Sequence, residues 1–86
     1  MSLNVEIITP SQSLQAGEAT EVVAPAALGE VGILPMHARY LTTLTAGELR
    51  IRSAANETRY QITGGLLTVS DDKVTILVDG LSQAAA

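Results

Sequence analysis

The chain contains no cysteine, no phenylalanine and no tryptophan, and its only aromatic residues are two tyrosines. Without cysteine, neither disulfides nor a zinc site built on thiolates can hold the fold. Valine, isoleucine, leucine and alanine must therefore supply the core, and the β-branched residues among them favour strands. The chain has 86 residues, near the lower limit at which one hydrophobic core supports a fold. We therefore expect a single domain over residues 1–86.

Positive charge is also scarce, since five lysine and arginine residues stand against nine acids and the formal net charge is −4. Such a chain has no basic stripe that could neutralise a phosphate backbone, so nucleic acid is not an expected ligand. Its apolar runs are far shorter than the ~20 residues that span a bilayer, and its first residues lack a signal-peptide pattern. We expect a soluble protein without a transmembrane segment, made in the compartment where it works.

Apolar residues are nevertheless abundant, at 47% of the chain. That fraction is high for a small domain, whose surface is large relative to its volume. The excess predicts that some apolar surface meets a partner.

Alternation of apolar and polar residues with a period of two dominates the chain and predicts strands. We expect strands over residues 3–7, 19–24, 48–53, 57–63, 66–70 and 74–79. Turns at residues 54–56 and 71–73 would join the last four into hairpins. Residues 81–86 fit either a tail or the first turn of a helix. Because no longer segment has the spacing of an amphipathic helix, the pattern predicts an all-β antiparallel sandwich or flattened barrel.

Residues 29–51 combine turn formers with the single histidine of the chain. Gly29, Gly32 and Pro35 stand close together with apolar residues between them, which predicts a loop of fixed shape rather than a flexible linker. A shaped loop on a small β domain usually contacts something. Glu30 and His37 mark the two ends of this predicted loop, although each residue alone fits a solvated turn equally well.

The sequence does not support an enzyme. His37 would be the only histidine base for a serine nucleophile, and no serine lies in a Gly-x-Ser-x-Gly elbow. One histidine with scattered acids also falls short of a zinc site. Gly64 and Gly65 lack the helix and the Lys-Ser/Thr pair of a phosphate-binding loop, so they predict a kink or bulge between strands. We expect no catalytic residues, no cofactor and no metal.

Several motif blocks, in a fixed order over residues 3–79, resemble the N-terminal β domain of the epsilon subunit of F-type ATP synthases. The blocks are Gly-Glu-Val-Gly-Ile-Leu-Pro-x-His-Ala at residues 29–38, Leu41-Thr42, Gly47-Glu48-Leu49-Arg50-Ile51, Gly64-Gly65 with Leu67 and Val69, and Lys73-Val74-Thr75-Ile76-Leu77. Met36 stands where the family customarily has glycine, and Arg39 stands where it has proline. The family usually continues into a C-terminal helical hairpin, so the resemblance implies the β domain without that hairpin.

The resemblance implies a ten-stranded flattened β-sandwich in the central stalk of a rotary ATP synthase, peripheral to the cytoplasmic face of the bacterial cell membrane. This non-catalytic subunit would couple the gamma subunit to the membrane-embedded c-ring in proton-driven ATP synthesis. Glu30 and His37 match loop positions facing the c-ring, and Thr42 and Thr9 match positions near gamma. Aliphatic surface on the sandwich would supply the contact with gamma. The alternative is a stand-alone β-sandwich module that binds a small molecule or another protein.

Overall fold

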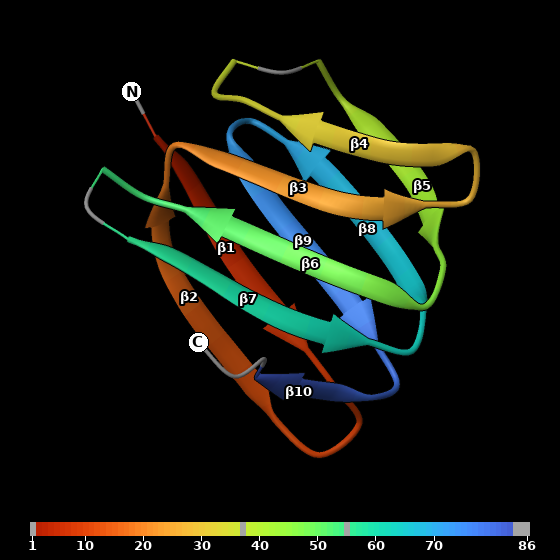
Figure 1. Cartoon of the computed structure of the whole chain (residues 1–86). Helices are drawn as coiled ribbons and strands as arrows, with labels where there is room; N and C mark the ends of the chain where they lie inside the picture. The colour runs from red at the N-terminus through yellow and green to blue at the C-terminus, as the bar shows by residue number, and fades with distance from the viewer. Residues whose placement is uncertain (1, 37, 55, 84–86) are drawn as a thin grey trace.

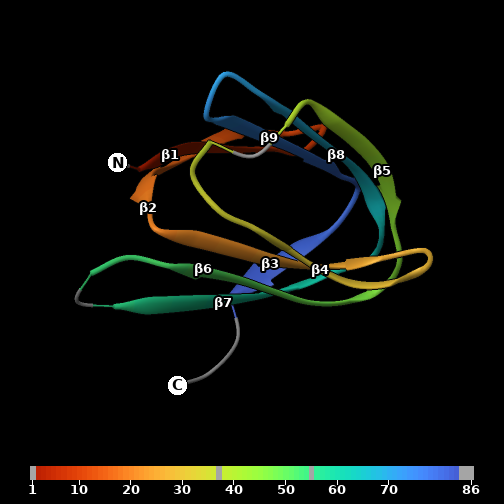
Figure 2. The same ribbon diagram turned by 90° about the horizontal axis from the view of Figure 1, so that it is seen from above.

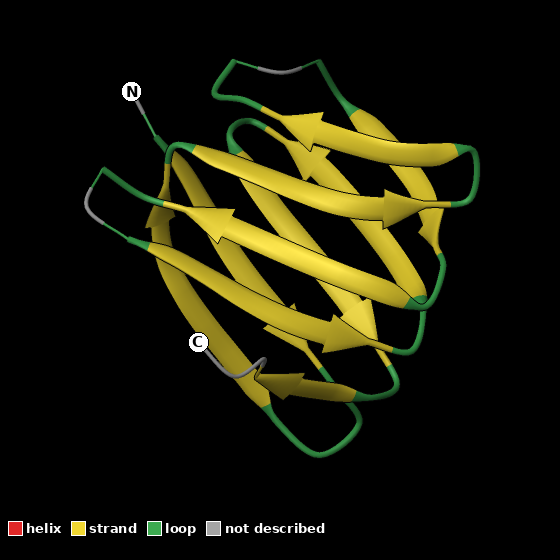
Figure 3. Ribbon diagram, in the orientation of Figure 1, coloured by secondary structure: helices red, strands yellow, loops and turns green. Residues whose placement is uncertain are grey.

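A computed structural model describes residues 2–36, 38–54 and 56–83. Over these residues the chain forms ten strands and no helix (Figure 3). The strands are β1 (Leu3–Ile8), β2 (Ser13–Ala19), β3 (Glu21–Ala26), β4 (Gly29–Ile33), β5 (Tyr40–Leu44), β6 (Gly47–Arg52), β7 (Glu57–Ile62), β8 (Gly65–Ser70), β9 (Lys73–Val78) and β10 (Leu81–Gln83).

The strands form two layers that face each other, as Figures 1 and 2 show. One layer has the order β4-β3-β6-β7-β10, and the other has the order β5-β8-β9-β1-β2. The layers belong to one hydrogen-bonded sheet because β3 also pairs with β5, where Ala26 lies opposite Leu44. The expected ten-stranded all-β sandwich is confirmed.

One strand pair departs from the expected antiparallel pattern. β1 runs parallel to β9, with Val5 opposite Val74 and Ile7 opposite Ile76. The other strand pairs among the described residues are antiparallel. Parallel neighbours require a long crossover, and here that crossover contains seven of the ten strands. Alternation along the sequence predicts hairpins between consecutive strands. It does not reveal a pairing between strands that are so far apart in the sequence.

The core between the layers consists of aliphatic side chains, as the composition requires. Its largest fully buried members are Leu3, Ile7, Ile33, Leu49, Leu67 and Ile76. No polar or charged side chain is buried in the described part of the chain. Burying one such leucine or isoleucine contributes about 1.5–3 kcal/mol, and these contributions take the place of disulfides in holding this small domain together.

The loop expected in residues 29–51 is wrong in two parts, because Gly29–Ile33 forms strand β4 and Tyr40–Leu44 forms strand β5. Glu30 therefore lies in a strand and not at the tip of a turn. The sequence suggests a loop because glycine weakens strands in general. Here the backbone of β4 pairs with β3, and Ile33 is buried in the core. Tertiary pairing outweighs the local preference of the two glycines.

The strand predicted at residues 19–24 is also wrong in its boundaries. These residues cover the end of β2, a bend at Thr20 and most of β3. β3 continues through Pro25, where the strand was expected to stop, and the Pro25 carbonyl oxygen accepts a hydrogen bond of 2.8 Å from the Thr45 backbone N–H. Of the open segment at residues 81–86, the part that is described forms β10 along β7.

Gly64 and Gly65 form the corner at which the chain passes from β7 in one layer to β8 in the other. Their φ angles are 117° and 156°, in a region that side chains with a Cβ rarely adopt. A Cβ on Gly65 would overlap the carbonyl oxygen of Leu77 on β9. The predicted kink between strands is confirmed, and the close approach of β9 is what requires glycine.

We expect Gly65→Ala to lower the free energy of unfolding by at least about 2 kcal/mol, because the new methyl group forces either strain at φ or a shift of β9. Urea denaturation measures this loss. Gly32→Ala is the matched control: its Cβ would meet only the flexible Glu21 carboxylate at 3.4 Å, so its effect should stay within about 0.5 kcal/mol. Equal stability of the two variants would contradict the assignment of Gly65 to a sterically required corner.

Candidate functional site

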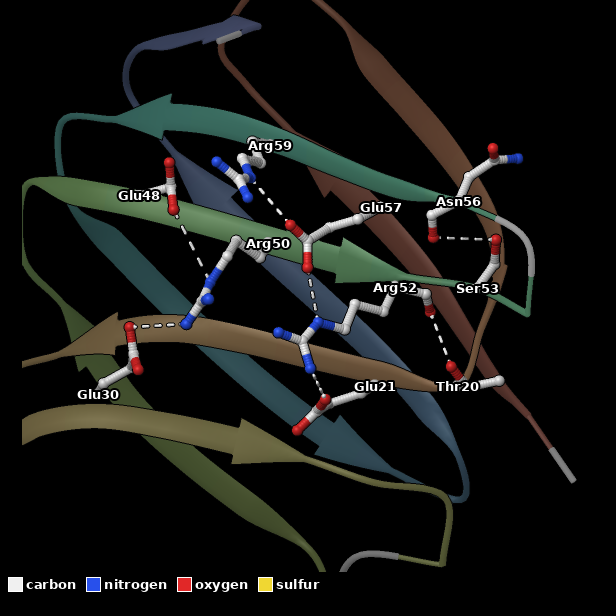
Figure 4. Close-up of polar contacts among 10 residues, drawn as sticks. All are labelled: Thr20, Glu21, Glu30, Glu48, Arg50, Arg52, Ser53, Asn56, Glu57 and Arg59. Carbon is white, nitrogen blue, oxygen red and sulfur yellow. Dashed lines mark hydrogen bonds and ion pairs between the residues drawn. The ribbon is translucent and has the colours of Figure 1, made fainter. Parts of the chain in front are cut away.

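The outer face of the β4-β3-β6-β7 layer has a network of alternating charges, which we call the ion-paired face (Figure 4). On β6 the outward residues Glu48, Arg50 and Arg52 alternate with the buried residues Leu49 and Ile51. Strand pairing brings the other members alongside. The ion-paired face consists of Glu21, Glu30, Glu48, Arg50, Arg52, Glu57 and Arg59.

Glu57 on β7 lies at the centre of this network. One carboxylate oxygen accepts a 2.6 Å hydrogen bond from Arg52 Nε, and the other accepts a 2.8 Å bond from Arg59 Nε. Arg52 also donates from Nη1 to Glu21 at 2.9 Å. The hydrogen bond from Arg52 is the largest cause that holds the pKa of Glu57 below its ordinary value of 4.5, and that from Arg59 is the next. These ion pairs between neighbouring strands stabilise the strand register and leave little unpaired charge for a partner.

Glu30 belongs to the same face but lies at its margin. Arg50 Nη2 contacts one of its carboxylate oxygens at 3.1 Å, and the Glu30 side chain is 61% exposed while that of Arg50 is 24% exposed. Arg50 Nε is 3.8 Å from Glu48, and it is buried without a hydrogen-bond partner. Over the described residues β4 pairs with β3 alone, so Glu30 sits on an edge strand, where another molecule can reach it.

The structure places the two predicted threonines on the other layer. Thr9 follows β1 in the β1–β2 turn, where its backbone N–H donates to the Gln12 carbonyl at 2.8 Å. It lines an open depression together with Ile8 and Leu77. Thr42 on β5 lies opposite the fully buried Leu67, so its half-buried side chain is on the inner side of the layer. His37 lies outside the described residues.

The predicted residues therefore do not form one patch. Glu30 lies on β4, at one edge of its layer, whereas Thr9 lies in the β1–β2 turn at the far end of the sheet order. Figure 1 shows β4 at the top of the molecule and the β1–β2 turn at the bottom. Thr42, on the inner side of β5, lies apart from Thr9, and the partner contacts of Glu30, Thr9 and Thr42 stay a prediction.

The outer face of the second layer is largely uncharged at its centre. Leu77 on β9 lies opposite Leu66 on β8 and opposite Ile8 on β1, and we call these three residues the aliphatic row. Leu77 is 39% exposed, and the other two are half-buried. Threonines on β8 and β9 continue this face beside the row. Such a surface matches the expected aliphatic contact area.

One contact that the sequence did not predict joins the β4–β5 connection to the β8–β9 turn. Asp71 and Asp72 form the expected turn, with φ angles of 51° and 61°. The Asp72 carboxylate also accepts a 2.6 Å hydrogen bond from the Met36 backbone N–H. Met36 has a φ of 66°, in the left-handed region that favours glycine. That conformation costs about 1–2 kcal/mol for a residue with a side chain, and a bond to a carboxylate contributes about 1.5–3 kcal/mol and offsets it.

No helix in the part of the chain that the structure describes is long and apolar enough to cross a membrane. Within the same residues, no three histidine, cysteine or acidic side chains gather in a way that could hold a metal ion.

The two-layer aliphatic sandwich, with one ion-paired face and one aliphatic face, defines a small β-sandwich domain whose surfaces suit contacts with other proteins. The family model described as ATP synthase, Delta/Epsilon chain, beta-sandwich domain matches residues 2–84. The chain belongs to this family.

Relatives with curated names agree with this assignment. The ATP synthase epsilon chain of Halorhodospira halophila is 48% identical over 80 residues, which cover 91% of this chain and 57% of that protein. This chain thus spans less than two thirds of the length of that relative.

Two solved structures share the fold. A chain of the Euglena gracilis mitochondrial ATP synthase, in an assembly of OSCP, F1 and c-ring, matches with a TM-score of 0.89 and 19% identity over 95% of this chain and 53% of its own. A chain of the Tetrahymena thermophila mitochondrial ATP synthase central stalk and c-ring matches with a TM-score of 0.81 and 22% identity over 95% of this chain and 66% of its own.

We expect Glu57→Gln to remove a part of the acid sensitivity of the domain. Because the folded pKa of Glu57 is depressed, its stabilising contribution is present above the unfolded pKa and is lost as the pH falls through the folded pKa. The difference in melting temperature between wild type and variant should therefore be largest near neutral pH and shrink well below pH 4.5. Glu48→Gln is the control, since its ion pair with Arg50 is long, at 3.8 Å. A constant difference across the pH range would show that Glu57 is not held by charge.

Proposed function

We propose that this chain is the β-sandwich domain of an ATP synthase epsilon subunit, a non-catalytic part of the central stalk that couples gamma to the c-ring. The similar solved chains come from assemblies whose descriptions contain a c-ring, and the family model covers nearly the whole chain. The observation that carries the proposal is the pair of different surfaces on one sandwich. A coupling element needs two separate docking areas on a body stiff enough to transmit torque.

The aliphatic row (Ile8, Leu66 and Leu77) is the proposed contact with gamma. Apolar area at the centre of an interface supplies affinity because it leaves water on binding. The row lies across three hydrogen-bonded strands, so its shape is fixed before binding. Thr9 borders it through the depression shared with Ile8 and Leu77, which supports the prediction of Thr9 near gamma.

The exposed edge at β4 is the proposed contact with the c-ring, with Glu30 and His37 as the contacting residues. Arg50 contacts one oxygen of Glu30, Oε2, at 3.1 Å, and the Glu30 side chain is 61% exposed. Glu30 can accept a hydrogen bond from a polar or basic loop while Arg50 remains in place. An acid held in this way gives orientation and register more than affinity.

In this function, residues 1–86 are one domain that lies peripheral to the cytoplasmic face of a bacterial membrane. The enzyme to which the domain belongs is driven by proton flow. The alternative of a stand-alone ligand-binding module would need a deep pocket with convergent polar groups. The depression at Ile8 and Thr9 is open, and no polar side chain is buried in the described residues. The observations therefore favour the coupling function.

The test of the proposed function is binding to purified gamma subunit and c-ring. We expect wild type to bind both, and Leu77→Lys to weaken binding to gamma by about tenfold or more, because a buried charge replaces apolar area at the interface centre. Titration calorimetry measures the affinity. The matched control is Gln61→Lys, which adds the same charge to the opposite face beside Glu48. Failure of wild type to bind either partner would overturn the proposal, and equal affinities of the two variants would remove the aliphatic row from it.

We expect the double variant Glu30→Ala with His37→Ala to reduce proton pumping per ATP hydrolysed in the reassembled enzyme, while the isolated domain stays folded. Glu30 is largely exposed, and exposed ion pairs contribute about 0–1 kcal/mol, so melting should shift by a few degrees at most. Glu18→Ala on β2 serves as a control for the loss of one exposed acid. A loss of several kcal/mol in the double variant would instead make these residues structural.

A further inference from the structure

The connection between β4 and β5 (residues 34–39) and the β8–β9 turn lie side by side, although 36 positions separate the two residues that join them. The Met36 backbone N–H donates to Asp72 Oδ1 at 2.6 Å, a short bond for an amide donor. Leu34 is 55% exposed and Met36 is 73% exposed. Packing therefore does little to fix these two side chains, and the bond to Asp72 can hold the backbone between the two hairpins.

Asp72 is itself held firmly. It occupies the second position of a two-residue hairpin turn in which Ser70 lies opposite Lys73, and both turn residues have positive φ, as this tight type of turn requires. Its carbonyl oxygen accepts a 2.8 Å hydrogen bond from the Asn4 backbone N–H. One residue thus joins the β4–β5 connection to the β8–β9 hairpin and to the start of β1.

We propose that Asp72 is a positioning residue that fixes the backbone at Met36 and so sets the surface that residues 34–36 present to a partner. Met36 has a left-handed backbone, which a residue with a Cβ leaves readily unless something holds it. The Asp72 carboxylate supplies that hold. This inference rests on the proposed function only for the identity of the partner, the c-ring, because the contact itself belongs to the isolated domain.

The first measurement is hydrogen exchange at the Met36 amide in the isolated domain. Asp72→Gly removes the carboxylate while glycine still accepts the positive φ of the turn. We expect exchange at Met36 to accelerate by about tenfold or more relative to wild type. Asp71→Gly is the matched control, because it changes the same turn at the residue beside Asp72, whereas the bond to Met36 comes from Asp72. Asp72→Asn keeps an acceptor oxygen and should restore most of the protection.

The second measurement is binding of the same variants to the c-ring. We expect Asp72→Gly to weaken binding severalfold more than Asp71→Gly, with Asp72→Asn close to wild type. Unchanged exchange at Met36 in Asp72→Gly would overturn the positioning role outright. Faster exchange with unchanged binding would overturn its part in docking. If wild type fails to bind the c-ring, the proposed function fails, while the exchange experiment still decides whether Asp72 fixes the backbone at Met36.

Discussion

Aliphatic packing between the two layers is the constraint on which the rest of this structure depends. The chain has no cysteine, phenylalanine or tryptophan, so its fold requires inward aliphatic residues from both layers to meet in one apolar interior. That requirement explains the corner at Gly64 and Gly65, which carries the chain from β7 in one layer to β8 in the other. The same requirement explains the parallel pairing of β1 with β9, which brings strands distant in the chain over the same core. It also leaves the outer faces free to differ.

The two outer faces differ in the way they treat charge. On β6 and β7, Arg52 and Arg59 form ion pairs with Glu57. This surface therefore stabilises the strand register and has little unpaired charge. On the same face, Glu30 at β4 remains largely exposed on an edge strand. Across the sandwich, the aliphatic row offers area without charge. Because the strands beneath both surfaces share one core, a force applied at one face reaches the other with little deformation.

The backbone at Met36 shows how one side chain can hold a surface residue that the core does not reach. Met36 adopts a left-handed conformation with a φ of 66°, and Asp72 holds it from another hairpin. The sequence predicts the β8–β9 turn only as a polar turn, and in the structure this turn also holds Met36 through a hydrogen bond. The sequence indicated the unusual position of Met36, but neither the partner nor the direction of the contact could be read from it.

The sequence alone determined the all-β class, the hairpins around residues 54–56 and 71–73, the aliphatic core and the family, because alternation with a period of two and the ordered motif blocks are local properties of the chain. From the sequence we predict a loop at Glu30 and the end of a strand before Pro25. Glycine and proline interrupt strands when only their neighbours in the sequence are considered. Only the tertiary structure decided that β4 forms along β3 and that Arg50 binds Glu30. It also decided that β1 joins β9 in parallel. The Arg50–Glu30 contact and the β1–β9 pairing join segments distant in sequence, and β4 forms because its backbone pairs with β3 and Ile33 enters the core, which local preferences do not reveal.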